Sequence, residues 1–433
     1  MTIAGGVLAG AGSRLLPASI PFRFFGAAVA FHLVAWLAAL AGAQALPAFA
    51  GGLGWPLASL HAVTLGVLAM TAIGASLQLF PVATRRPIAH GRLAAAIFWA
   101  YVPGVAALVA GMGLASPPLL VAGGTAVALA LVAFVVVLGR NLAGAKGMPL
   151  VVAHGAVATV ALVATLVTAG LAVAGYSVAI PVPRTSVLAL HVSLATYGFM
   201  GMLALGLSYV LVPMFALGEP VAPERGWASF ALATVALLLA VAAALGATPE
   251  VLTVAAAGLG MVAAILHVQS MRGVLANGLR RDLGTGFRLV ALAWAAMVAS
   301  LALALVIALV PAEPRLVTLF GATLVAGWLL TFVLGILQRI VPFLAAMHAG
   351  RGQRRPPTPS SLTHERALRL HARLHVLALA LLALAIVLGV GAIALAAAVA
   401  GSVAAIAYAV FFTRAARAIA HPPLHAAPRA PTP

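Results

Sequence analysis

The stretch LHAVTLGVLAMTAIGASLQLFP, residues 60–81, decides the fold because its pattern occurs three times in the chain. The pattern is G-x7-G-x6-P, and its copies are Gly66, Gly74 and Pro81, then Gly198, Gly206 and Pro213, then Gly327, Gly335 and Pro342. In a membrane helix such glycines let a neighbouring helix or a flat ligand approach the backbone, and the proline is expected to end the helix. Helix packing and room for a planar cofactor both remain open as reasons for the glycines.

Composition predicts an integral membrane protein. Of the 433 residues 64% are hydrophobic and 7% are charged, whereas about a quarter of a soluble domain is charged. Apolar runs long enough to cross a bilayer are expected at Phe24–Ala43, Leu57–Phe80, Leu93–Leu114, Leu119–Leu138, Leu150–Ala172, Val187–Met214, Trp227–Leu245, Val251–His267, Phe287–Val310, Leu316–Leu344, Leu368–Leu388 and Ala392–Phe412. We therefore expect an all-α fold of twelve transmembrane helices in one domain, 24–413, with three pseudo-repeats of four helices at about 24–140, 150–272 and 287–413.

The positive charges predict the orientation of the chain in the membrane. The net charge is +18, and of the 24 lysines and arginines only Arg184 and Arg315 fall between spans on one of the two faces. By the positive-inside rule the other face is cytoplasmic and holds both termini: an N-terminal segment, 1–23, and a Pro-rich tail, 414–433. This distribution predicts a bacterial-type inner (plasma) membrane protein whose arginines meet lipid headgroups, and it argues against a nucleic-acid partner.

Two kinds of residue are missing from the predicted spans. The chain has no cysteine, which excludes disulfides and thiolate metal sites. All six carboxylates fall in predicted loops or at helix ends, whereas pumps and ion-coupled carriers use carboxylates within the membrane. Proton pumping is therefore not expected, and any metal must be bound by histidine, methionine or oxygen.

The overall pattern resembles subunit I of the haem-copper oxidase and nitric oxide reductase superfamily. The likeness consists of twelve helices in three groups of four, with a histidine at the outer end of helix 2 that is followed by glycine and a terminal proline. The resemblance implies that His61 in LHAVTLG is an axial ligand of a low-spin haem. It implies that His191 in LHVSLATYG corresponds to the copper ligand that the family carries on helix 6.

The chain also departs from that family. Helix 7, WASFALATVALLLAVAAAL, lacks the family's paired histidines. Helix 10 has Thr318 and Phe320 where the family has ligands to both haems, and the helix 6 position of a family tyrosine is Ala195, with Tyr197 two residues further on. A complete dioxygen-reducing binuclear centre is not expected. The chain is similar to a divergent branch, such as the oxidase-subunit-I-like or NnrS-like membrane proteins.

The candidate cofactor-binding residues are His61, His191, His32, Gly66 and Gly198, and His61 and His191 are the candidate metal ligands. Each of these two histidines lies four residues inside its predicted helix, about 6 Å below the outer boundary at about 1.5 Å per residue. A histidine at that depth marks a function or forms hydrogen bonds with its neighbours. His32, near the centre of helix 1, is a second axial ligand or a buried donor to a carbonyl.

A further group, His364, His371 and His375, shares one face of the predicted helix 11. Neutral imidazoles could bind a transition metal there, but the arginines at 366, 369 and 373 oppose a second cation. A solvated start to helix 11, facing the lipid headgroups, is the preferred interpretation. Interfacial anchoring is likewise expected for His90, His154 and His267.

Two function hypotheses follow. The first is a divergent haem-copper-oxidase-like protein that binds haem b or copper in the outer half of the bilayer and acts in electron transfer or in handling nitric oxide, haem or copper. The second is a cofactor-free transporter or assembly factor on the same scaffold. The first implies oxidoreductase-like chemistry, with other respiratory or assembly subunits as membrane partners.

Overall fold

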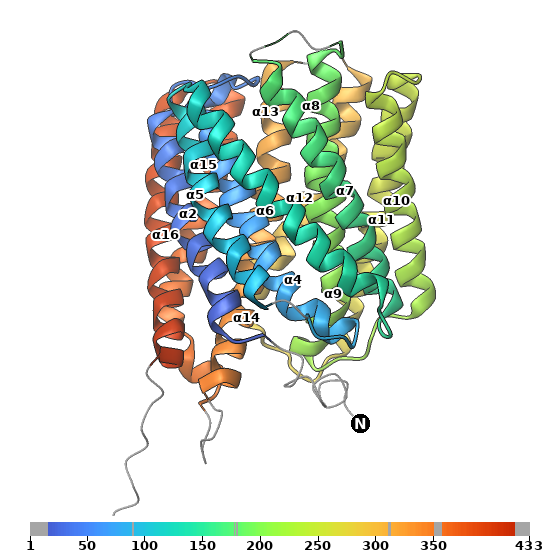
Figure 1. Ribbon diagram of the computed structural model, residues 1–433, viewed down its shortest axis with the longest axis vertical. Coiled ribbons are helices and arrows are strands. Elements are labelled where there is room, and N and C mark those ends of the chain that lie inside the picture. Colours follow the sequence, from blue (N-terminus) through green and yellow to red (C-terminus); the bar gives the residue numbers. More distant parts are fainter. Residues whose placement is uncertain are drawn as a thin grey trace, which may run out of the picture.

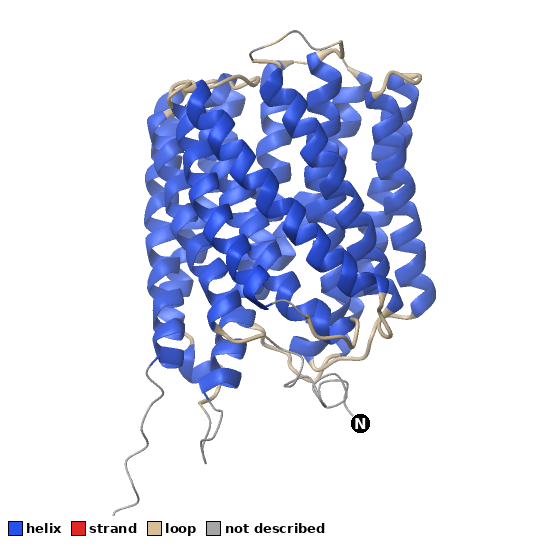
Figure 2. Ribbon diagram, viewed as in Figure 1, coloured by secondary structure: helices blue, strands red, loops and turns tan. Residues whose placement is uncertain are grey.

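The computed structural model describes residues 16–88, 91–176, 178, 181–310, 313–349 and 357–420. Within these ranges every regular element is a helix (Figure 2), and twelve helices are long and apolar enough to cross a membrane. The helices run side by side in one bundle (Figure 1). The predicted number of spans is confirmed. Residues 1–15 and 421–433, which include most of the predicted N-terminal segment and of the predicted tail, lie outside the described residues, as does His90.

The first repeat contains α2 (Ser19–Ala41), a second span made of α3 (Trp55–His61), η2 (Ala62–Ala69) and α4 (Met70–Ala83), then α5 (Gly91–Gly113) and α6 (Pro117–Ala143). The second contains α7 (Pro149–Ala174), the span α8 (Arg184–Ser193), η3 (Leu194–Gly201) and α9 (Met202–Ala216), then α10 (Pro223–Ala244) and α11 (Pro249–Asn277). The third contains α12 (Gly284–Leu309), the span α13 (Pro314–Ala322), η4 (Thr323–Leu330) and α14 (Thr331–Ala349), then α15 (Glu365–Leu388) and α16 (Gly391–Ala420). Two single-turn 3-10 helices, η1 (Leu46–Ala48) and η5 (Ser360–Leu362), lie in the connections.

The prolines of the repeated pattern do not end their helices, so this prediction was wrong. Pro81 lies inside α4, Pro213 inside α9 and Pro342 inside α14, which continues to Ala349. Proline removes one backbone donor, but in a membrane the chain gains most by keeping its remaining backbone groups hydrogen-bonded within a helix. The second span of each repeat therefore continues past its proline.

The second span of every repeat contains a π-helix of eight residues: η2, η3 and η4. The first glycine of the repeated pattern is the fifth residue of each π-helix, at Gly66, Gly198 and Gly327. π-helices are rare, and they occur frequently at functional sites. Since η4 contacts both η2 and η3, the three π-helices meet in the interior of the bundle.

The glycines of the pattern pack each second span against the first helix of its own repeat. A Cβ on Gly198 would stand 2.7 Å from the Cβ of Ala161 in α7, and one on Gly66 would stand 2.6 Å from the Cβ of Phe31 in α2. In the third repeat a Cβ on Gly335 would stand 2.7 Å from the carbonyl oxygen of Gly286 in α12. These contacts support helix packing as the reason for the glycines, because protein atoms fill the space that a flat ligand would need there.

A tyrosine supports the first π-helix. The Tyr101 hydroxyl of α5 donates a hydrogen bond of 3.1 Å to the carbonyl oxygen of Leu65 in η2, and its ring is fully buried. We expect Tyr101→Phe to lower the free energy of unfolding by about 1 kcal/mol, since one hydrogen bond is lost and the carbonyl stays buried. Thermal unfolding of the purified protein measures this change, and an unchanged unfolding midpoint would contradict it.

Candidate functional site

A cavity of about 690 Å³ lies between the three repeats. Its wall is formed by α3, α8 and α13, which precede the π-helices, and by parts of α2, α10, α11 and α12. α8 and α13 lie at the end of the bundle opposite to α4, α9 and α14 (Figure 1). The lining is mostly aliphatic and aromatic, with few polar groups, which is typical of small-molecule and cofactor sites.

His61 is the last residue of α3 and lies on the wall of this cavity. Its Nδ1 is 3.1 Å from the carbonyl oxygen of Leu57, one turn earlier. Because a carbonyl can only accept, Nδ1 carries the proton and Nε2 keeps its lone pair. Histidines that ligate metals usually donate their other ring N–H in this way.

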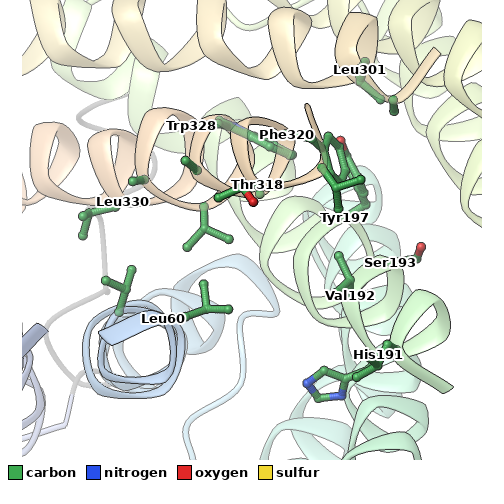
Figure 3. Close-up of a pocket in the computed structure, with 18 of the residues that line it drawn as sticks. Leu60, His191, Val192, Ser193, Tyr197, Leu301, Thr318, Phe320, Trp328 and Leu330 are labelled. Atoms are coloured by element: carbon green, nitrogen blue, oxygen red, sulfur yellow. The ribbon is translucent and has the colours of Figure 1, made fainter. Parts of the chain in front are cut away.

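His191 lies on α8, also on the cavity wall, and Val192 and Ser193 line the wall further along the same helix (Figure 3). Its Nδ1 is 3.3 Å from the hydroxyl oxygen of Thr168 in α7. That hydroxyl donates to the carbonyl oxygens of Thr165 and Ala164, at 3.0 and 3.2 Å. It therefore accepts from His191, which leaves the lone pair of His191 on Nε2 as well.

The structure brings the two cavity histidines together, although they belong to different repeats. The centres of the His61 and His191 rings are 6.5 Å apart, and the ring planes are inclined by 22°. Both side chains are half-buried and line the cavity. Two imidazoles with the same protonated nitrogen thus lie on the wall of one apolar cavity, each with a lone pair on Nε2.

His32 does not join this pair. Its ring is fully buried between α2, α15 and α16, and its Nε2 accepts a hydrogen bond of 3.2 Å from the indole Nε1 of Trp36. The His371 and His375 rings lie 6.0 and 6.5 Å from it. The expectation that these two histidines face the headgroups was wrong: both are 0% exposed, since the face of α15 that carries them packs into the bundle. His364 caps α15 by accepting from the backbone N–H of Ala367 at 3.3 Å.

The expectation of interfacial anchoring was also wrong for His154 and His267. They are 1% and 0% exposed and pack with Tyr209, whose hydroxyl is 3.3 Å from the Nδ1 of His267. α11 continues as a helix to Asn277, well beyond its predicted end at His267. α7 begins at Pro149, close to its predicted start, and His154 is buried there because its ring packs against Tyr209 and Phe230. Both residues therefore lie inside the helix bundle.

Sequence reasoning did not identify three residues of the site. Thr168 is a mid-helix threonine of α7, and nothing in its local pattern distinguishes it from Thr165. Tyr197 and Trp328 lie in η3 and η4 and line the cavity (Figure 3), with ring centres 5.6 Å apart. Both lie next to a repeated glycine in the sequence, Tyr197 before Gly198 and Trp328 after Gly327, and this position could have identified them.

Two sides of the cavity are formed by the seventh span, α10, and by the start of the tenth span, α13, and their lining residues include no histidine. α10 contributes Ala233, Ala236, Leu237 and Ala240, and α13 contributes Val317, Thr318, Phe320, Gly321 and Ala322. The Thr318 hydroxyl donates to the carbonyl oxygens of Phe49 and Pro314. Across the described residues, no group of three or more histidines or carboxylates is placed to hold a metal ion. The paired nitrogens of His61 and His191 are therefore the candidate ligand set.

Comparison with known proteins gives a structural likeness. A chain from the cryo-EM structure of a heme-copper terminal oxidase dimer superimposes with a TM-score of 0.65 at 13% sequence identity, over 95% of this chain and 86% of that chain. No family model matches the sequence, and no curated protein matches it. The likeness confirms the predicted fold: an all-α, multi-pass membrane protein with the architecture of a haem-copper oxidase.

Proposed function

We propose that this protein is a divergent, haem-binding relative of the haem-copper oxidases, in which His61 and His191 would together hold one b-type haem. The observation that carries the proposal is the pair of rings with centres 6.5 Å apart on the wall of the cavity. The family's second axial ligand on helix 10 has no counterpart here, and a helix 6 histidine takes that role.

The ring separation fits one metal ion between the two imidazoles. With metal–nitrogen bonds of about 2.0–2.1 Å, the two nitrogens are about 4 Å apart, and each nitrogen lies about 1.1 Å from its ring centre. The two ring centres would then be about 6.3 Å apart, close to the 6.5 Å between His61 and His191. The spacing of the two rings is therefore compatible with one iron that both imidazoles would hold.

The number of ligands favours haem over copper. Protein sites for zinc or copper draw three or four ligands from side chains, whereas a porphyrin supplies four nitrogens and leaves one or two axial positions for the protein. Within the described residues the site offers two histidines and no third histidine or carboxylate. The cavity of about 690 Å³ lies within the usual range for small-molecule sites, about 300–1,000 Å³.

The residues of this chain would hold the haem in a mostly apolar cavity. When bound, a haem supplies one-electron redox chemistry, which is its own contribution. His61 and His191 would give their Nε2 lone pairs to it, while the Leu57 carbonyl and the Thr168 hydroxyl accept from the opposite nitrogens and keep them protonated. The wall around the two histidines is mostly apolar, which suits a haem. The proposed role is electron transfer or the handling of nitric oxide or haem.

Reduction of dioxygen at a haem-copper centre is not part of the proposal. The side of the cavity formed by α10 is lined by Ala233, Ala236, Leu237 and Ala240, and none of these can ligate copper. A second haem would likewise need a ligand from the tenth span, which begins with α13. There Thr318 already donates to the carbonyl oxygens of Phe49 and Pro314. The proposal is therefore limited to one haem.

The proposed orientation puts the histidine pair in the outer half of a bacterial inner membrane. The first span begins and the last span ends at one face of the bundle (Figure 1), as an even number of spans requires. The positive-inside rule assigns that face to the cytoplasm, because Arg184 and Arg315 are the basic residues of the opposite face. A redox partner would then reach the haem from the outer side, or laterally from another membrane subunit.

Optical spectroscopy and metal analysis of the purified full-length protein test the proposal. We expect Soret and α bands of a low-spin b-type haem after reduction, with about one iron per chain and no stoichiometric copper. A haem-loaded preparation is needed, so the host should be supplied with a haem precursor. If reduced protein shows neither band and contains no iron, the haem proposal is wrong and the cofactor-free carrier or assembly factor becomes the better hypothesis.

The hydroxyl of Thr168 provides a second test. Thr168→Val keeps the shape of the side chain but removes the hydroxyl that accepts from the Nδ1–H of His191, and it leaves the backbone carbonyl of Thr165 near that histidine. We expect haem affinity to fall by about 10- to 100-fold, the usual effect of losing such a supporting group, and the matched change Thr165→Val to have less effect. Haem titration of the apo-protein measures both, and equal affinities for Thr168→Val and the unmodified protein would contradict the assignment.

A further inference from the structure

A second group of histidines lies outside the cavity, between α2, α15 and α16. His32, His371 and His375 are each 0% exposed. The centres of their rings form a triangle with sides of 6.0, 6.5 and 5.4 Å. One ring nitrogen of each histidine is buried and has no hydrogen-bond partner in the protein: His32 Nδ1, His371 Nε2 and His375 Nδ1. Buried polar atoms left unpaired cost about 1–3 kcal/mol each, so three in one place require a ligand.

Hydrogen bonds at the other nitrogens define which of these three atoms carries a proton. The indole N–H of Trp36 donates to His32 Nε2, so the proton of a neutral His32 is on Nδ1. His371 Nδ1 faces the carbonyl oxygen of Ala404 at 3.1 Å, so it is protonated and Nε2 is a lone pair. Neutral imidazoles are expected, because no carboxylate accompanies them inside the membrane and an unpaired buried charge is costly.

The same argument applies to His375. Its Nε2 is 2.9 Å from the hydroxyl oxygen of Thr331, which donates its own proton to the carbonyl oxygen of Ala326 at 2.8 Å. His375 Nε2 therefore donates, and its Nδ1 is a lone pair. The triangle thus holds one N–H, on His32, and two lone pairs, on His371 and His375.

The three rings are too far apart to satisfy one another. A direct N–H···N bond of at most about 3.2 Å places two ring centres no more than about 5.4 Å apart, since each nitrogen is about 1.1 Å from its ring centre. The centre of the His32 ring lies 6.0 and 6.5 Å from the other two. The remaining pair, His371 and His375, has two lone pairs and no proton to share. A bridging molecule is needed.

The size of the triangle shows whether a metal ion or a hydrogen-bonded oxygen fits between the three rings. The circumscribed radius of a triangle with these sides is about 3.5 Å, so no point lies closer than this to all three ring centres. A metal at about 2.0–2.1 Å from each nitrogen would need ring centres about 3.2 Å away. An oxygen at about 2.9 Å needs them about 4.0 Å away, and such a point exists just outside the plane of the three centres.

We propose that His32, His371 and His375 bind one water molecule inside the membrane domain. The oxygen accepts from the N–H of His32, and its two protons are donated to the lone pairs of His371 and His375. If each nitrogen points at the oxygen, the directions from the oxygen to the three ring centres make angles of about 85–110° with one another. These angles are near the tetrahedral preference of water. A buried water of this kind typically makes about three hydrogen bonds.

The water site is joined to the wall of the cavity on two sides. Trp36, which donates to His32, lines the cavity, and so does Ala326, whose carbonyl receives the hydroxyl of Thr331. The site therefore holds an α2 side chain and the η4 backbone in the positions that shape the cavity. Its occupancy does not depend on haem, so its test is independent of the proposed function.

An experimental density map of the full-length protein, at a resolution that shows ordered water, tests the site. We expect one peak at about 2.7–3.2 Å from His32 Nδ1, His371 Nε2 and His375 Nδ1, with no anomalous scattering at the copper, zinc or iron edges. In His375→Phe the peak should be lost, whereas in the matched variant His267→Phe, which changes a buried histidine elsewhere, it should remain. A metal signal, or rings that contact each other with no peak between them, would overturn the proposal.

Nitrogen-15 NMR of the unmodified protein with labelled histidine provides a test that does not require a variant to fold. The expected result is neutral rings with the proton on Nδ1 in His32 and His371 and on Nε2 in His375. A proton on Nε2 of His32 would remove the N–H that His32 donates to the proposed water, and finding it would also overturn the proposal.

Discussion

His61→Ala is expected to abolish the low-spin haem spectrum and to lower the iron content of the purified protein by more than about tenfold. Loss of a group that only supports a ligand already costs about 10- to 100-fold in metal affinity, so loss of an axial ligand costs at least as much. His191→Ala should have the same effect, because the two rings flank one space. Spectra of dithionite-reduced samples and iron analysis measure both.

The control for these variants is His364→Ala, which removes a histidine that caps α15 at the opposite face. It should retain the full spectrum. Added imidazole should restore part of the spectrum in His61→Ala, because the cavity left by the side chain can admit the free ligand, and it should not affect the control. If haem bands survive in both His61→Ala and His191→Ala, the fold can still bind haem, but the two ligands would have been assigned wrongly.

Gly335→Ala is expected to lower the free energy of unfolding by about 1–3 kcal/mol, the usual cost of adding a methyl group to a packed interior. The added Cβ would stand 2.7 Å from the carbonyl oxygen of Gly286 and 3.1 Å from a methyl group of Val290. The first of these is backbone and cannot rotate away, so α12 and α14 must separate. Thermal or denaturant unfolding in the same detergent measures the change.

Gly139→Ala is the matched control, because a Cβ at Gly139 meets no atom within 4 Å. It should be neutral or stabilising, since alanine is favoured over glycine in a helix by about 1 kcal/mol. Gly286→Ala should cost as much as Gly335→Ala, because its Cβ would stand 2.6 Å from the carbonyl oxygen of Gly335. In the double variant the second change should cost less than the first, since the helices are already apart. Equal unfolding free energies for Gly335→Ala and Gly139→Ala would refute the close approach.

Much of the fold could be read from the sequence because the bilayer restricts what a chain can do. Apolar runs of about 20 residues must form helices, since no other structure satisfies the backbone in lipid. The repeated glycines at 66, 198 and 327 likewise indicated three equivalent helices, and each lies at the same place in a π-helix. The π-helices themselves could not be predicted, because the extra residue per turn has no signature in hydrophobic spacing.

The candidate site was only partly accessible to sequence reasoning. His61 and His191 could be selected by their depth, because both are titratable groups inside apolar spans. Their separation of 6.5 Å could not be predicted, since it depends on how α3 and α8 cross between repeats. The partner of His191 on the preceding helix, Thr168, was likewise hidden by its distance along the chain.

The sequence by itself determined that the protein lies in a lipid bilayer and how many spans it has. It also excluded thiolate ligands, because the chain has no cysteine, and it placed no carboxylate within a predicted span. Only the tertiary structure decided which histidines meet. His371 and His375 have the spacing of a solvated helix face with arginines nearby, yet they are fully buried beside His32. The physical reason is that hydropathy sets the depth of a residue along the membrane normal, whereas the face of a helix that turns inward depends on its neighbours, which come from distant parts of the chain.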